Sequence, residues 1–153
     1  MRVLGIDLGE RRIGVAISDA SATLARPLRT LERDRSDAEA AGALLALIDE
    51  LNTEDEVGCL VIGLPTRLDG SASDQTARVH KLAGLLAART AIPIVMQDER
   101  LSSHEAEGRL STLERDWRKR KAKLDAAAAA VILQDYLDQQ KSQGSVIGDQ
   151  GSE

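Results

Sequence analysis

Aromatic residues are nearly absent from this chain, which has no phenylalanine, one tryptophan and one tyrosine among its 153 residues. Proteins that bind single-stranded nucleic acid without sequence preference stack successive bases on aromatic side chains. Trp117 and Tyr136 are too few to form such a platform. Any recognition of nucleic acid should therefore depend on phosphates and on shape.

Cysteine and long apolar runs are scarce as well. Because Cys59 is the single cysteine, no internal disulfide can form, which favours a reducing cytoplasm. The longest apolar stretches, such as Cys59–Leu64 and Ala126–Leu133, are far too short to span a bilayer. The N-terminal residues lead directly into a strand-like segment and lack the pattern of a signal peptide. The sequence thus predicts a cytoplasmic protein that makes no membrane contact.

The formal net charge of −5 argues mildly against nucleic acid as a partner, but the distribution of charge matters more than its sum. Acidic residues are frequent between Glu32 and Glu56, whereas Arg115–Lys123 is strongly basic. This basic stretch is either a solvated helix face or a phosphate-binding surface, and we favour phosphate binding. Its central cations are Arg118, Lys119, Arg120 and Lys121. Trp117 is either an anchor for its own helix or a wedge that enters a junction.

The first third of the chain predicts three strands in quick succession, Val3–Leu8, Ile13–Ser18 and Thr23–Thr30. Gly9 allows a tight turn after the first strand. Pro27 in the third strand suggests a sheet edge or a bulge, because proline cannot donate a ladder hydrogen bond. Such short connections favour an antiparallel meander.

Helical spacing then alternates with further strands. Capping boxes at Ser36–Glu39 and Ser102–Glu105 each predict the start of a helix. The remaining predicted elements are a strand at Cys59–Leu64, a helix containing Val79, Leu82, Leu85 and Leu86, a strand at Pro93–Gln97 and an alanine-rich helix at Lys123–Gln139.

Together these elements predict an α/β fold with a five-stranded mixed sheet. Three strands form the antiparallel meander, two are parallel, and helices flank the sheet. No linker divides the chain, so we expect a single domain over residues 1–139. The tail at residues 140–153 is rich in glycine, serine and glutamine and is expected to be disordered.

Acidic residues stand at the ends of two strands and at the start of the last helix. Asp7 ends the first strand, Asp98 and Glu99 end the last one, and Asp125 precedes five consecutive alanines. Functional sites in such sheets gather at the carboxyl ends of strands, and small alanines let a helix approach closely. Clustered carboxylates repel one another unless a cation neutralises them, and oxygen ligands favour Mg²⁺ or Mn²⁺. The sequence therefore predicts a metal site.

Each acid also has a simpler explanation. Asp7 suits a turn, Asp125 suits a helix N-terminus, and Asp98–Arg100 suits a surface ion-pair group. Their occurrence together in this topology favours the metal site. Adjacent strand residues point to opposite faces of a sheet, so we expect only one of Asp98 and Glu99 to bind metal, and the sequence does not decide between them.

Five short motifs occur in order along residues 1–138. They are Gly5–Gly9 with Arg12–Ala16 and Ser18–Asp19, then Gly63–Pro65, Asp69–Ser71, Asp98–Ser103 and Lys123–Ala128. In these motifs the chain resembles the YqgF family of ribonuclease H-like proteins. That family is described both as candidate Holliday junction resolvases and as nucleases that mature the 5′ end of pre-16S rRNA. Ser102 and Ser103 replace the family's usual pair of threonines and keep the hydroxyl groups.

The resemblance implies hydrolysis of phosphodiesters with two metal ions about 4 Å apart. Asp7 would bridge the ions, with Asp98 or Glu99 and with Asp125 completing the cluster. Arg12, Arg100 and the basic stretch would hold phosphates. The substrate would be an rRNA precursor or a four-way DNA junction, with RNA slightly favoured. A resolvase would be expected to act as a homodimer, because it makes symmetric cuts.

Two other functions fit parts of the sequence. A protein of the same fold without catalysis would bind nucleic acid in transcription or on ribosomes, but the three intact acidic positions argue against it. An ATP-binding lobe of the actin-like type begins with a similar Gly5–Gly9 turn. Such proteins need two lobes around the nucleotide, and this chain supplies one.

Overall fold

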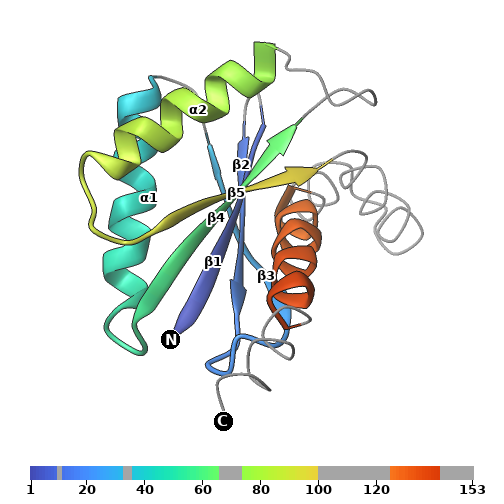
Figure 1. The fold of residues 1–153 in the computed structure, drawn as a ribbon. Helices are drawn as coiled ribbons and strands as arrows, with labels where there is room; N and C mark the ends of the chain where they lie inside the picture. The colour runs from blue at the N-terminus through green and yellow to red at the C-terminus, as the bar shows by residue number, and fades with distance from the viewer. Residues whose placement is uncertain (10–11, 33–35, 66–73, 100–124, 142–153) are drawn as a thin grey trace, which may run out of the picture.

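A computed structural model describes residues 1–9, 12–32, 36–65, 74–99 and 125–141 of the chain. Three strands come first along the chain, and helices then alternate with strands (Figure 1). In chain order they are β1 (Arg2–Leu8), β2 (Arg12–Ser18), β3 (Ala25–Glu32), α1 (Asp37–Leu51), β4 (Val57–Pro65), α2 (Asp74–Ala87) and β5 (Ile94–Glu99). A C-terminal helix at residues 125–141, drawn in orange, follows them and ends two residues beyond the predicted end.

The five strands form one sheet in the order β3-β2-β1-β4-β5. β1, β2 and β3 are antiparallel neighbours, whereas β4 runs parallel to β1 and β5 runs parallel to β4. The predicted mixed sheet, with its three-stranded meander and two parallel strands, is therefore confirmed. Because β1, β4 and β5 run in one direction, their carboxyl ends lie along the same edge of the sheet.

The turns of the meander follow from single residues. The Gly9 N–H donates to the Arg12 carbonyl at 2.9 Å, which closes the hairpin between β1 and β2. β3 is an edge strand, and its pairing with β2 shifts register opposite Pro27 and Arg29. Both expectations for Pro27 are confirmed, because an edge strand and a bulge tolerate a missing N–H donor.

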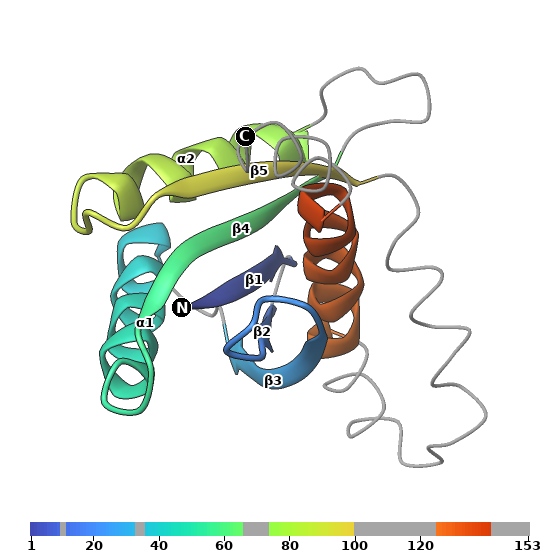
Figure 2. The same cartoon turned by 60° about the horizontal axis from the view of Figure 1, so that its bottom comes forward.

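One face of the sheet is covered by α1 and α2 (Figure 2). The α1 helix begins as predicted, with the Ser36 hydroxyl accepting a hydrogen bond from the Glu39 N–H at 3.2 Å. Large aliphatic side chains from the strands and both helices form the first core on this face. Its fully buried members include Leu4, Ile6, Ile13, Val15, Ile17, Leu44, Leu60, Ile62, Leu82 and Leu86.

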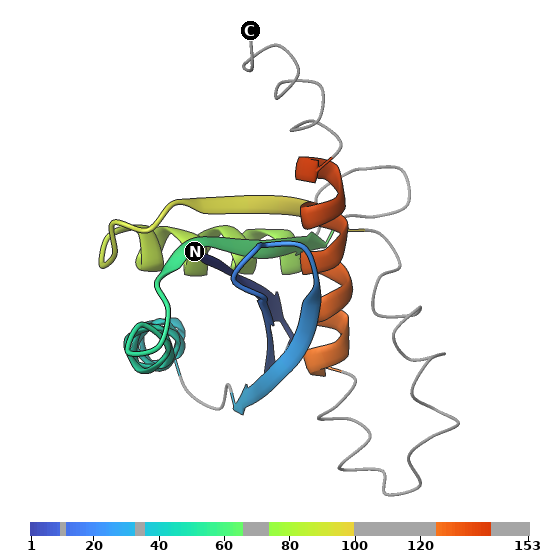
Figure 3. The same ribbon diagram turned by 90° about the horizontal axis from the view of Figure 1, so that it is seen from below.

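The opposite face is covered by the C-terminal helix, so that the sheet lies between two helical layers (Figure 3). The second core on this face is smaller and joins the strand residues Ala16 and Val61 to Ala129, Ile132 and Leu133 of the helix. No helix in the described part of the chain is long and apolar enough to cross a membrane.

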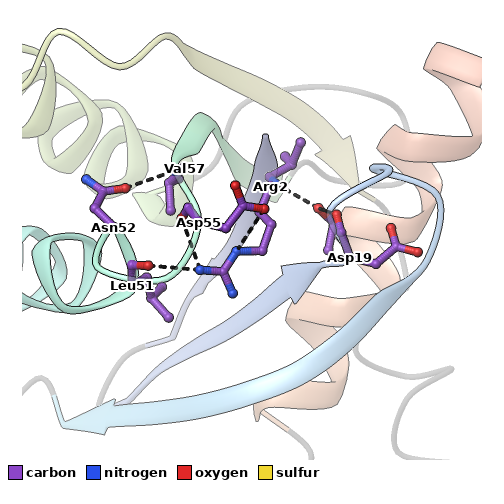
Figure 4. A network of polar contacts seen from close by, with 8 residues as sticks. Arg2, Asp19, Leu51, Asn52, Asp55 and Val57 are labelled. Atoms are coloured by element: carbon purple, nitrogen blue, oxygen red, sulfur yellow. Dashed lines mark hydrogen bonds and ion pairs between the residues drawn. The ribbon is translucent and has the colours of Figure 1, made fainter.

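The amino end of β1 is tied to the end of α1 by a buried arginine (Figure 4). The Arg2 guanidinium donates to the carbonyl oxygens of Leu51 at 2.9 Å and Asp55 at 3.0 Å. Nearby, the Asn52 side chain accepts from the Val57 N–H at 2.9 Å. These bonds satisfy polar groups where α1 turns into β4. They fix the sheet at the end opposite the carboxyl end of β1, which stays available for a site.

Candidate metal centre

Asp7 is the next-to-last residue of β1 and is partly buried. Its neighbours Ile6 and Leu8 pack into the first core. Because successive strand residues point to opposite faces, Asp7 lies on the face of the C-terminal helix. A charged side chain at this strand end is therefore directed at the helix and away from the main core.

Three glycines let that helix approach the sheet. They occupy neighbouring strands on the same face, Gly14 on β2, Gly5 on β1 and Gly63 on β4. A Cβ atom on Gly5 would lie 2.7 Å from the Leu133 Cβ, and one on Gly63 would lie 2.5 Å from the Ile132 Cδ1. The helix thus packs on bare backbone, as the alanines after Asp125 led us to expect.

The helix brings Asp125 to Asp7. Gly14 is the cross-strand partner of Asp7, and a Cβ atom on Gly14 would overlap the carbonyl group of Asp125. The Oδ2 atom of Asp125 is buried. Burial, and after it the negative charge of Asp125, raise the pKa of Asp7 from 3.8 to about 6. Two carboxylates from distant parts of the sequence therefore meet at the end of β1.

The strand β5 does not bring Asp98 to this pair. Asp98 is exposed and is the register partner of Leu64, on the side of the sheet where Ile94 and Met96 pack into the first core. The next position, 99, is the partner of Pro65 and belongs by alternation to the face of Asp7. The Glu99 side chain lies outside the described residues. Among the side chains that are described, no three acids, histidines or cysteines are grouped closely enough to hold a metal ion.

Arg12 begins β2 and is partly buried. It alternates with Ile13 of the first core, so it lies on the same face as Gly14, beyond it toward the end that carries Asp7. The other predicted phosphate-binding residues, Arg100 and Arg118–Lys121, lie outside the described residues, as does Trp117.

Sequence reasoning missed the three glycines beneath the C-terminal helix and one helix residue that fastens this helix to the sheet. The Gln134 side chain accepts from the Ala25 N–H at 2.8 Å and donates to the Thr23 carbonyl at 3.0 Å, which fastens the helix to the turn before β3. A signal for the glycines was present, because they alternate with apolar residues in three strands. A signal for Gln134 was not, since a glutamine in a helix is ordinary.

The strand order and the helices on both faces of the sheet are those of the ribonuclease H-like fold. Among solved structures, Fowlpox virus resolvase in complex with its substrate Holliday junction DNA has the same fold, with a TM-score of 0.52. The likeness covers 91% of this chain and 98% of the viral chain at 7% sequence identity, so it shows the fold alone.

The chain belongs to the RuvX (YqgF) family: its residues 1–139 match the family described as "RuvX: Holliday junction resolvase". Relatives named "Putative pre-16S rRNA nuclease" include a Nocardioides protein, 43% identical over 148 residues that cover 95% of this chain and 93% of the relative. A Chloroflexus aurantiacus protein of the same name is 42% identical over 140 residues, covering 92% and 88%. The prediction of a nuclease is therefore confirmed. Nucleases and resolvases of this family generally use divalent metal ions.

Proposed function

We propose that this protein hydrolyses phosphodiester bonds in a structured rRNA precursor, with Asp7, Glu99 and Asp125 as ligands of Mg²⁺ or Mn²⁺. The observation that carries the proposal is the meeting of Asp7 and Asp125 at the carboxyl end of β1. The glycines of the sheet and the alanines of the helix both permit this close approach. A pair of carboxylates that only capped a helix or closed a turn would not need this approach.

The residues fit a hard divalent cation. Burial, and after it the repulsion between the carboxylates of Asp7 and Asp125, raises the pKa of Asp7 to about 6. A cation between them would remove that repulsion, and Mg²⁺ and Mn²⁺ prefer carboxylate oxygens. We assign the third ligand to Glu99, because the alternation of β5 gives position 99 the face of Asp7 and gives Asp98 the opposite face.

Divalent ions bound by such carboxylates supply an activated water and stabilise the leaving oxygen of a phosphodiester. The chain's own residues hold and orient the components. Asp7 is fixed by the β1 ladder and Asp125 by the contact of its backbone with Gly14. Arg12, on the same face, is placed to bind a substrate phosphate through its guanidinium. Arg100 and the cations of the basic stretch would extend phosphate binding along the substrate.

The rRNA precursor is favoured over the DNA junction by the names of the relatives, which match this chain over most of its length. The four-way junction is the second candidate, since the family is described by that activity. With a net charge of −5, binding should be weak at non-specific sites and should fall steeply with salt. Such binding suits an enzyme that selects its substrate by shape.

Cleavage assays on the wild type and three variants test the site. Labelled pre-16S rRNA and a labelled four-way junction are incubated with Mg²⁺ or Mn²⁺. Asp7→Asn and Glu99→Gln should each reduce cleavage at least about 100-fold, because the loss of a metal ligand removes several kcal/mol of transition-state stabilisation. Asp98→Asn is the matched control and should retain activity. Metal-dependent cleavage that survives Asp7→Asn would refute the site, and a preference for the junction would refute the RNA assignment.

The homodimer and the cytoplasmic location stay predictions. Sedimentation of the protein alone and with the four-way junction tests the first, since a resolvase that makes symmetric cuts should sediment as a dimer on the junction. A protein that remains monomeric on the junction would favour the RNA substrate further.

A further inference from the structure

Among the three glycines beneath the C-terminal helix, Gly14 has the tightest contact with it. A Cβ atom at this position would overlap the carbonyl group of Asp125 and would lie 3.0 Å from the backbone nitrogen of Ala126. These are backbone atoms of the first helical turn, so they cannot move aside as a flexible side chain can. Gly14 is also the register partner of Asp7. Gly14 therefore contacts the C-terminal helix at Asp125 and pairs with β1 at Asp7.

The rest of the helix is held by contacts farther along it. Leu133 packs on Gly5, Ile132 packs on Gly63, and Gln134 is hydrogen-bonded to the turn before β3. These contacts would stay in place if the first turn were pushed outward. A methyl group at position 14 would thus tilt the start of the helix away from β1 and leave the remainder docked.

We infer that Gly14 is a positioning residue that sets the separation of Asp7 and Asp125 and thereby the metal affinity of the centre. The inference rests on the metal site proposed above. Gly14 touches neither metal nor substrate; it acts by having no side chain where Asp125 must come close.

The main experiment compares Gly14→Ala with Gly63→Ala. Both add one methyl group under the same helix, but at Gly63 the nearest atom is the terminal Cδ1 of Ile132, which can rotate away. Gly14→Ala should raise the Mn²⁺ dissociation constant about tenfold or more, as loss of a residue that orients a ligand does. A displacement of about 1 Å should also lower the cleavage rate at saturating metal about 100-fold. Gly63→Ala should leave the dissociation constant unchanged.

A general loosening of the helix must be separated from a displacement of Asp125. Leu133→Ala removes packing from the second core beneath the same helix and lies farther along it from the centre. It should lower the melting temperature and leave the Mn²⁺ dissociation constant unchanged, measured by electron paramagnetic resonance of bound Mn²⁺. Equal losses of affinity in Leu133→Ala and Gly14→Ala would overturn the inference, because they would make Gly14 one packing residue among several.

A second pair of variants covers the case in which Gly14→Ala does not fold. Asp125→Glu keeps Gly14 but lengthens the side chain by about 1.5 Å. If the close contact fixes the separation, this longer side chain overreaches, and Mn²⁺ binding should weaken. Where Gly14→Ala does fold, the same change in that background should restore part of the affinity. Unchanged binding in Asp125→Glu would overturn the inference.

The wild type and Asp7→Asn separate this inference from the proposed function. Tight Mn²⁺ binding by the wild type that is lost in Asp7→Asn, together with unchanged binding in Gly14→Ala, would refute the role of Gly14 alone. Failure of the wild type to bind Mn²⁺ would refute the metal site itself, and the role of Gly14 would fall with it.

Discussion

The two faces of the sheet are packed with residues of different size. Toward α1 and α2 the strands contribute leucine, isoleucine and valine, many of them fully buried. Toward the C-terminal helix three of the same strands contribute Gly5, Gly14 and Gly63, and helix residues Leu133, Asp125 and Ile132 pack directly on them. The first core has more buried apolar side chains than the second. Because buried apolar surface contributes about 25 cal/mol per Å², the first face is the main source of stability.

This difference in side-chain size indicates that the second face serves the close approach of the C-terminal helix. Glycine in a strand loses more conformational entropy than alanine, by roughly 0.5–1 kcal/mol, and gives up a side chain that could pack. Three such glycines beneath one helix are unfavourable for stability alone. They are explained if the helix must come near enough to carry Asp125 to Asp7. One face holds the fold together, and the other assembles the centre.

The largest stability effect is expected on the first face. Leu44 of α1 is fully buried in the first core. Leu44→Ala should lower the free energy of unfolding by about 2–5 kcal/mol, through lost burial and the cavity left behind. Urea titration measures this change. In the folded variant the Mn²⁺ affinity should equal that of the wild type, and a clear loss of affinity would contradict the division between the faces.

In metal-free protein, Asp7→Asn should raise the free energy of unfolding, whereas Leu44→Ala should lower it. The folded-state pKa of about 6 lies above the ordinary value of 3.8, so the ionised carboxylate destabilises the fold at high pH. Two pKa units correspond to about 3 kcal/mol. The destabilisation is complete above about pH 6, declines as the pH falls from 6 to 3.8, and is absent below 3.8. Asp7→Asn should therefore stabilise metal-free protein at pH 7.5.

Unfolding curves in the presence of a chelator, at pH 7.5 and at about pH 4, measure this difference. The gain from Asp7→Asn should be about 3 kcal/mol at the higher pH and should be much smaller at the lower one. Asp98→Asn is the matched control, because Asp98 is exposed on the other face. An equal gain at both pH values would show that the pKa of Asp7 is not raised in the fold.

Much of the fold could be predicted because the patterns are local. The turn at Gly9, the cap at Ser36 and the edge position of the strand with Pro27 each depend on residues close together in sequence, and each is confirmed. The strand limits were less accurate. β4 begins at Val57, two residues before the predicted Cys59, since the hydrogen bond from its N–H to Asn52 extends the ordered segment.

The site could be predicted only in part, because its decisive features are not local. The sequence indicated that Asp7 and Asp125 would meet, since five alanines follow Asp125. It could not choose between Asp98 and Glu99, because the choice depends on which residues of β5 lie beside Leu64 and Pro65. Nor could it identify the contact at Gly14, which exists only once β2 and the last helix are in place.

A smaller loss of stability is expected when the far end of the C-terminal helix is released. Gln134→Ala removes the bonds to the Ala25 N–H and the Thr23 carbonyl, which are partly buried. The cost should be about 1–3 kcal/mol, because both backbone groups lose their partner. Denaturant titration measures it. Cleavage should fall less than in Gly14→Ala, because Gln134 is remote from Asp125 along the helix, and a larger fall would assign Gln134 the positioning role.

The smallest change in stability is expected from a substitution confined to the first face. It tests most directly whether that face influences the metal centre. The Ser36 hydroxyl caps α1 by accepting from the Glu39 N–H. Ser36→Ala should lower the free energy of unfolding by about 1 kcal/mol, whereas Ser36→Gly should lower it by only a few tenths. Neither variant should alter Mn²⁺ affinity or cleavage. If a change confined to the cap of α1 did weaken metal binding, the helices on the first face would be coupled to the centre, and stability and assembly would not be divided between the faces.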